Sequence, residues 1–201
     1  LLPADLAAAS LIFVADAVSA EAAATLRAQA EAGQTIVFAP KRADAAGGAT
    51  LGALAGGEPM RMTEVRPSSY AMFAEIDFQH PLFAPFADPR YSDFTKIHFW
   101  KYRKIDVASL PGARVVAKFD SGDPALIEMP LGKGRLYVLA SGWQPDDSQL
   151  AVSSKFVPLL WSLLESSGGV GPLVTNTIVG ETIALPADGS ALAVRGPDGT
   201  T

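Results

Sequence analysis

Two short apolar runs joined by a helical stretch constrain the fold of this chain more than any other feature. Leu11–Ala15 (LIFVA) and Thr35–Ala39 (TIVFA) are continuous apolar runs, the pattern of strands covered on both faces. Between them the pattern is helical, with Ser19 predicted as the N-cap and Gly33 as the residue that ends the helix. A strand, a helix and a strand within about 30 residues predict a βαβ unit, and therefore a pair of parallel strands.

The second half of the chain predicts an antiparallel meander. Its three strand patterns, separated by turn residues, are Ala113–Phe119, Pro124–Met129 and Arg135–Ala140. The PLGKGR stretch in the second turn is similar at first sight to a phosphate-binding loop. However, Ile127 stands where that motif needs a glycine, and Gly134 stands where it needs Ser or Thr. Because a strand follows instead of a helix, we interpret Gly132-Lys133-Gly134 as a hairpin turn.

Three further segments complete the expected order of elements: a short helix within Ala45–Met60, an edge strand at Lys96–Ile105 and an amphipathic helix at Lys155–Ser166. After residue 167 the composition changes to short β-type runs with turn signals such as Asp188-Gly189. We therefore expect an α/β domain over residues 1–167. Residues 168–201 are expected to be a linker and the first strands of a truncated β module.

Composition excludes several classes of function. The chain has no cysteine, which rules out thiolate nucleophiles, disulfides and zinc–thiolate sites. Sixteen basic and 21 acidic residues give a net charge of −5 without a long run of either sign, which argues against a nucleic-acid partner. No apolar run reaches the ~18–20 residues needed to span a bilayer, so we expect this piece of chain to be soluble.

Four segments together carry a resemblance to a known family. They are 4–40, 78–86 (FQHPLFAPF), 120–141 (DSGDPALIEMPLGKGRLYVLAS) and 153–164 (SSKFVPLLWSLL). The 120–141 pattern is similar to a signature of class I glutamine amidotransferase-like domains that lack the amidotransferase site, for example the trimerisation domain of certain β-galactosidases. Taken together, the segments resemble the soluble domain of large bacterial membrane proteins of the Bat type, which begin with an aerotolerance-regulator membrane segment. The resemblance covers residues 3–167.

The resemblance implies a class I glutamine amidotransferase-like, flavodoxin-like fold. We therefore expect a doubly wound, mostly parallel sheet with a C-terminal antiparallel meander, followed by a short β segment. The active members of the superfamily use a catalytic Cys, which this chain lacks, and Ser141 has no G-x-S-x-G context to replace it. The implied function is a non-catalytic interaction domain of a membrane-anchored protein, in a periplasmic position. Its implied partners are other domains of the same protein or a separate protein.

One crevice is a candidate for ligand binding. In open parallel sheets, ligands bind beyond the carboxyl ends of the strands. Three predicted strands end near charged or aromatic residues, and these candidates are Asp16, Lys41, Arg42, Trp143 and Asp146. The alternative, which we favour, is that Asp16 and Lys41 or Arg42 form a solvent-screened pair of little energetic consequence.

Neither a metal nor a cofactor is predicted. The two histidines, His80 and His98, stand 18 residues apart without a metal-binding motif, and the ring of His80 is expected to bond a backbone group. Two other functions stay open. One is a degenerate hydrolase that uses Asp16 or Asp146 with a bound water, and the other is a small-molecule or carbohydrate sensor with Trp143 as an exposed aromatic.

Overall fold

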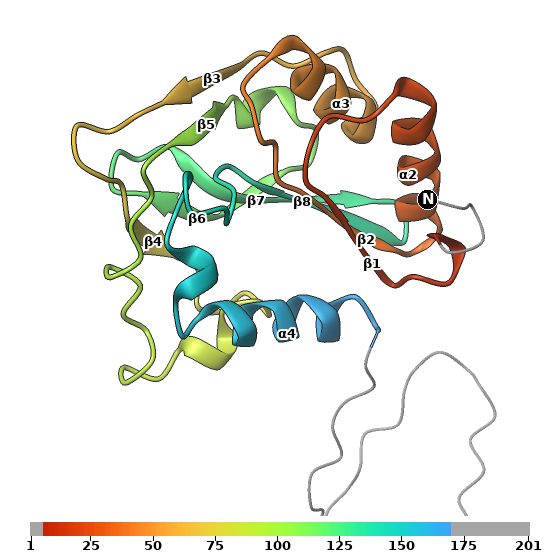
Figure 1. The fold of residues 1–201 in the computed structure, drawn as a ribbon. Helices are drawn as coiled ribbons and strands as arrows, with labels where there is room; N and C mark the ends of the chain where they lie inside the picture. The colour runs from red at the N-terminus through yellow and green to blue at the C-terminus, as the bar shows by residue number, and fades with distance from the viewer. Residues whose placement is uncertain (1–5, 170–201) are drawn as a thin grey trace, which may run out of the picture. The chain divides into compact units, whose positions relative to one another are not determined.

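A mixed six-stranded β-sheet runs through residues 6–169, the part of the chain that the computed structural model describes (Figure 1). In spatial order its strands are β1 (Leu11–Val14), β2 (Thr35–Phe38), β8 (Gly134–Leu139), β7 (Pro124–Leu131), β6 (Arg114–Phe119) and β4 (Phe73–Ile76). Strands β1, β2 and β8 are parallel, whereas β7, β6 and β4 each pair antiparallel with the preceding strand in that order.

Helices cover both faces of the sheet. Helices α2 (Ala20–Ala32) and α3 (Ala45–Ala55) lie on one face and α4 (Phe156–Ser166) on the other (Figure 1). Each face has its own apolar core: Leu26 of α2 and Leu54 of α3 belong to one, and Leu159 of α4 belongs to the other. The sheet therefore separates two cores, because successive side chains along a strand point to opposite faces.

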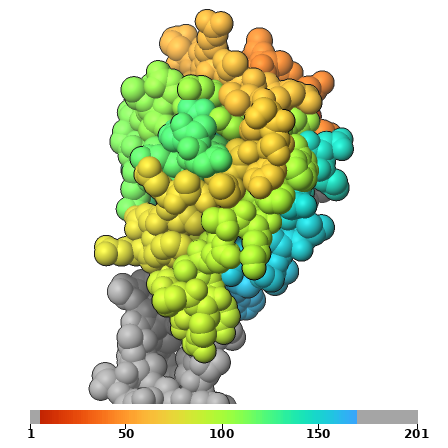
Figure 2. Space-filling model, turned by 90° about the vertical axis from the view of Figure 1, so that its left-hand side faces the viewer, coloured from red at the N-terminus to blue at the C-terminus, as the bar shows by residue number. Residues whose placement is uncertain are grey.

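A second sheet of two strands lies beside the first. It pairs β3 (Met62–Val65) antiparallel with β5 (Tyr102–Ile105). Figure 2 views this end of the molecule and shows that the segments coloured yellow to yellow-green, which run from β3 to the loop before β5, form the middle and lower part of this face. The strand expected over Lys96–Ile105 is shorter than predicted, because only Tyr102–Ile105 pairs with β3, whereas Phe99 forms isolated bridges to Ala71 and Ser148.

The predicted βαβ unit is confirmed. Strands β1 and β2 pair in parallel, from Leu11 opposite Thr35 onward. The Ser19 Oγ atom accepts a hydrogen bond from the amide of Ala22, and Gly33 ends α2 with a φ of 134°. The helix expected within Ala45–Met60 is α3, and the three strands of the expected meander are β6, β7 and β8.

The prediction of a doubly wound, mostly parallel sheet is wrong. In the described residues only the pairs β1–β2 and β2–β8 are parallel, and the other three pairs of the main sheet are antiparallel. A parallel pair needs a crossover of a dozen or more residues, but short turns join β6 to β7 and β7 to β8. The parallel strand direction of the βαβ unit is therefore not continued in β7, β6 and β4.

The expected division at residue 167 stays a prediction, because residues 170–201 lie outside the described residues. Within the described part, no helix combines the length and the apolar character that crossing a membrane requires.

The glycines of the PLGKGR turn are needed for a close approach between the β7–β8 hairpin and the end of α2. Gly132 has a φ of 57°, and a Cβ atom there would lie 2.6 Å from the carbonyl oxygen of Glu31. At Gly134 a Cβ atom would lie 2.1 Å from the carbonyl oxygen of Gln34. The turn is therefore the hairpin that the sequence predicted, and it also fixes the distance between hairpin and helix.

We expect Gly134→Ala to lower the free energy of unfolding by about 2 kcal/mol or more, because the added methyl group would meet backbone atoms that cannot move away. The measurement is urea denaturation followed by circular dichroism. Gly57→Ala is the matched control, since in the described part of the chain no atom beyond its two neighbours lies within 4 Å of the position that its Cβ would take. Equal stability of the two variants would contradict the close approach.

Candidate functional site

The structure brings the carboxyl ends of three parallel strands together, as the crevice hypothesis requires. Strands β1, β2 and β8 are neighbours in that order. Their ends lead into Asp16, into Lys41 and Arg42, and into the loop from Ser141 to Ser148. This is the edge at which open sheets bind ligands.

A buried ion pair fills this edge. Arg103 of β5 is fully buried, and its Nη1 atom donates to Asp147 Oδ2 at 2.5 Å. The other oxygen of Asp147 lies 2.9 Å from the Nζ atom of Lys101, and the amide of Gly142 donates to Asp147 Oδ2 at 3.2 Å. Arg103 also donates through Nη2 to the carbonyl oxygen of Lys41. One guanidinium group therefore links the end of β2 to the loop after β8.

Hydrogen bonds to backbone carbonyl groups connect β5 and the segment before it to the loop after β8. The amide of Arg103 donates to the carbonyl of Ala140 at 2.7 Å, so β5 crosses the end of β8. The hydroxyl of Ser141 donates to the carbonyl of Lys101 at 2.8 Å, and the amide of Trp100 donates to the carbonyl of Asp147 at 2.8 Å. The protein's own groups thus fill the edge at the ends of β2 and β8.

The structure places the predicted residues apart from a common site. Asp16 and Arg42 form an exposed pair, with 3.8 Å between Oδ2 and Nη2, as the favoured alternative proposed. Lys41 takes part through its backbone carbonyl, and its side chain is exposed. Asp146 is exposed as well, whereas the next residue, Asp147, is buried.

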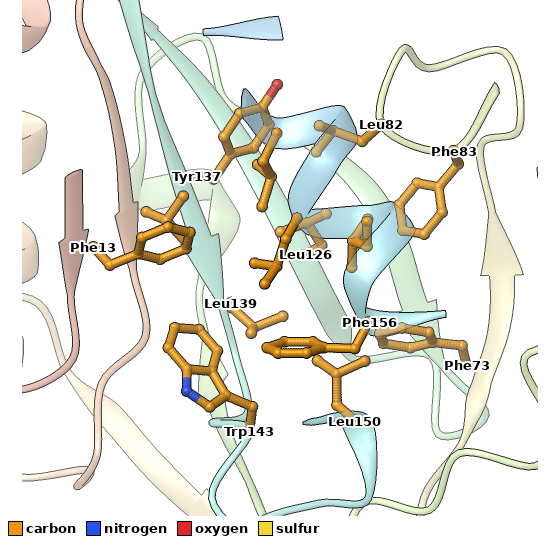
Figure 3. Close-up of a pocket in the computed structure, with 14 residues that line it drawn as sticks. Phe13, Phe73, Leu82, Phe83, Leu126, Tyr137, Leu139, Trp143, Leu150 and Phe156 are labelled. Atoms are coloured by element: carbon orange, nitrogen blue, oxygen red, sulfur yellow. The ribbon is translucent and has the colours of Figure 1, made fainter. Parts of the chain in front are cut away.

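Trp143 lines an apolar cavity on the α4 face of the sheet instead of the crevice. Its ring lies edge-on to Phe13, with 5.7 Å between the centroids, and 6.1 Å from the ring of Phe156 (Figure 3). The cavity has a volume of about 30 Å³ and is lined only by apolar and aromatic residues, with Leu126 and Leu139 at its centre. This space is close to that of a single water molecule, so it is a packing gap rather than a substrate site.

A second buried cluster of charges was not predicted. Glu128 of β7 is buried, and its carboxylate accepts from the hydroxyl of Tyr137 at 2.9 Å and from Arg114 Nε at 2.6 Å. Arg135 Nη1 lies 3.3 Å from Glu128 Oε1. His80 is buried behind them: its Nδ1 atom accepts from the amide of Leu82, so the proton is on Nε2, which lies 3.3 Å from Glu128 Oε2. The expectation that the His80 ring bonds a backbone group is confirmed.

The surroundings of Glu128 hold its charge over a wide pH range. The contact with His80, assisted by Arg114 and Tyr137, lowers the pKa of Glu128 to about 2 although burial opposes this. Burial, together with the nearby carboxylate, raises the pKa of Tyr137 to about 12. The cluster therefore contains an anionic carboxylate and a neutral phenol at all pH values near neutrality. A charged residue inside the apolar strand PALIEMPL was the sequence signal for it.

A larger groove lies along the outer edge of β1. It has a volume of about 470 Å³ and is lined by β1, by the loop to α2 and by the first turns of α2. Phe13 lines it and is 40% exposed, which is unusual for a phenylalanine in a strand. The two charged residues of its lining are Asp16 and Glu21, and both are acidic.

Comparison with known proteins shows likeness in fold alone. No family model and no curated protein matches the chain. Two solved structures that resemble it are a cytoplasmic protein from Salmonella typhimurium (TM-score 0.60, 13% identity, 82% of this chain and 74% of that chain) and a cytoplasmic protein from Salmonella typhimurium LT2 (TM-score 0.55, 17% identity, 83% and 73%). A β-galactosidase from Bacillus circulans sp. alkalophilus matches with a TM-score of 0.51 and 17% identity over 83% of this chain and only 23% of its own.

These findings correct the expected location. The two Salmonella structures are described as cytoplasmic proteins, which points away from the periplasmic position that the sequence resemblance implied. At these identities a shared fold does not carry a shared activity.

The low pKa of Glu128 predicts an acid-dependent stability. Because the folded-state pKa (about 2) is below the ordinary value of 4.5, the stabilisation is present above pH 4.5 and is lost as the pH falls towards 2. We expect the wild type to lose about 2 kcal/mol more than Glu128→Gln between pH 5 and 2.5, less than the full shift implies because Arg114 is largely exposed. Chemical denaturation at a series of pH values measures the difference.

Glu64→Gln is the control for this experiment, since Glu64 of β3 forms an exposed pair with Arg66. Its acid dependence is expected to match that of the wild type. A Glu128→Gln variant with the same acid dependence as the wild type would show that the cluster does not hold the carboxylate in its charged form.

Proposed function

We propose that the described residues form a non-catalytic interaction domain, similar to amidotransferase-like domains without a catalytic Cys, within a larger membrane-anchored bacterial protein. One observation carries the proposal. The strand-end edge is filled by the Arg103–Asp147 pair, while the sheet edge at β1 has a groove of about 470 Å³ beside it.

The outer edge of β1 has the properties of a surface that receives another strand. β1 is the last strand in the sheet order and pairs only with β2 among the described residues. Unpaired strand edges are usually protected by charged residues, proline or bulges, but Leu11–Val14 contains only apolar residues. An added strand would satisfy the free N–H and C=O groups of this edge and cover Phe13.

The charge of the groove limits what binds there. Asp16 and Glu21 face it, and none of the described residues that line it is basic. We infer that the occupant is an extended protein segment with alternating apolar side chains and at least one Lys or Arg. Such a segment could belong to another domain of the same protein or to a separate one, and the backbone pairing would be the same in both cases.

A carbohydrate sensor is the second candidate, although not through Trp143. The aromatic group at the surface is formed by Tyr70, His98 and Trp100, with the rings of Tyr70 and His98 stacked 3.8 Å apart. Tyr70 is 38% exposed, and flat aromatic faces with a polar edge suit ligands that are partly apolar. Thermal stabilisation by a sugar that is lost in Tyr70→Ala would favour this candidate over the first.

Site-specific crosslinking tests the interaction domain. A photoreactive phenylalanine analogue is placed at Phe13 in the full-length protein in its native host, and crosslinked peptides are identified by mass spectrometry. We expect crosslinks to one defined peptide with alternating apolar residues and at least one Lys or Arg, because Phe13 lies on the edge that the added strand would cover.

Val152 is the matched control position, since it is 83% exposed and lies on a 3₁₀ turn outside the groove. No more crosslinking at Phe13 than at Val152, or crosslinks scattered over unrelated peptides, would contradict the proposal.

A further inference from the structure

A hollow at the amino end of β8 is lined by several charged residues that the proposed function does not involve. It has a volume of about 390 Å³ and lies between the β7–β8 hairpin and the start of β6. The charged residues of its lining are Arg114, Glu128, Lys133 and Arg135. Three cations and one carboxylate give the hollow a net charge of +2, on a chain whose overall charge is −5.

The carboxylate of Glu128 is already satisfied from within the protein. Its Oε2 atom contacts Arg114 Nε at 2.6 Å and His80 Nε2 at 3.3 Å, and its Oε1 atom contacts the Tyr137 hydroxyl and Arg135 Nη1. These contacts hold both guanidinium groups in place without using most of their donors. Each guanidinium has five N–H groups in a rigid plane, so the donors that do not face Glu128 remain available for a ligand.

The available donors belong to three side chains around one hollow. Among the residues the structure describes, Arg114 bonds only through Nε, Arg135 only through Nη1, and the Nζ atom of Lys133 has no ion-pair partner. Arg135 is partly buried and paired at a fixed position, so less side-chain freedom is lost when it binds a ligand. Such a preorganised arrangement favours a ligand with several acceptor oxygens.

We propose that this hollow binds the phosphate dianion, either free or as the end of a small phosphate monoester. The charge of a dianion matches the net charge of the lining, and phosphate oxygens match the geometry of guanidinium donors. None of the described residues that line the hollow is aromatic, so they offer no ring on which a nucleobase could stack. This site differs from a P-loop because side chains, rather than the backbone amides at a helix N-terminus, hold the anion.

The experiment is a titration of the ¹⁵N-labelled protein with inorganic phosphate at constant ionic strength, followed by NMR. Amide signals of Gly112 and Gly134, which line the hollow, are expected to shift and saturate, while that of Gly122 in the β6–β7 turn stays unchanged. Lys133→Gln should weaken binding about fivefold and Arg135→Gln at least tenfold. Lys118→Gln removes the same charge away from the hollow, beside Glu75, and should leave the affinity unchanged.

Two further arms identify the source of the phosphate. Glycerol 3-phosphate tests a soluble monoester, and vesicles that contain phosphatidate test a lipid headgroup; binding of either that depends on Lys133 supports the site and assigns its ligand. Lys133 is exposed on the hairpin and has no ion-pair partner among the described residues, so its substitution leaves the fold intact. The proposal is overturned if phosphate gives no saturable shift at tens of millimolar, if chloride gives the same shifts, or if Lys133→Gln and Lys118→Gln bind equally well.

Discussion

The buried pair of Arg103 and Asp147 is the interaction on which the arrangement of this domain depends. The two residues are 44 positions apart in the sequence, and both side chains are almost completely buried. A buried charge without its partner is very costly, so β5 and the loop after β8 must meet whenever the chain is folded. The second bond of Arg103, to the carbonyl of Lys41, attaches the end of β2 to the same point.

The Arg103–Asp147 pair also distinguishes the two ends of the sheet, the carboxyl ends of the parallel strands and the amino end of β8. At the carboxyl ends of β2 and β8, the Arg103–Asp147 pair and its backbone partners fill the edge, whereas the groove beside β1 begins at the end of that strand. At the amino end of β8, Glu128 is also satisfied, but the cations around it, Arg114 and Arg135, extend beyond it to an open hollow. The first cluster therefore has a structural role, while the second holds donors ready for an anion. The open edge of β1 is separate from both.

The sequence predicted local structure well because local structure has local causes. The Ser19 cap, the apolar runs of β1 and β2 and the glycines of the β7–β8 turn each determine their own segment. The overall sheet was predicted wrongly because strand direction depends on the length of each connection and on partners distant in the sequence. A βαβ unit at the start does not determine how β4, β6 and β7 pair.

In the candidate site, too, features with local causes were predicted and features that depend on distant residues were not. The βαβ pattern predicted that the strands ending near Asp16 and Arg42 are neighbours, but it did not determine that β8, which ends near Trp143, would pair with β2. It did not show that Asp147, and not Asp146, would be buried, because the deciding partner, Arg103, comes from another sheet. The Glu128 cluster was missed for the same reason: His80 reaches it from a loop, and no spacing in the sequence records that contact.

A double-mutant cycle on Arg103 and Asp147 gives the most direct test of the closed strand-end edge. Arg103→Met and Asp147→Leu are expected to lower the free energy of unfolding by about 3–5 kcal/mol each, since each leaves a charge buried without its main partner. The double variant should be more stable than the sum of the two changes predicts, by at least about 2 kcal/mol, and Asp146→Asn should have no effect. Single variants as stable as the wild type, or changes that add within about 0.5 kcal/mol, would show that the pair does not hold this edge closed.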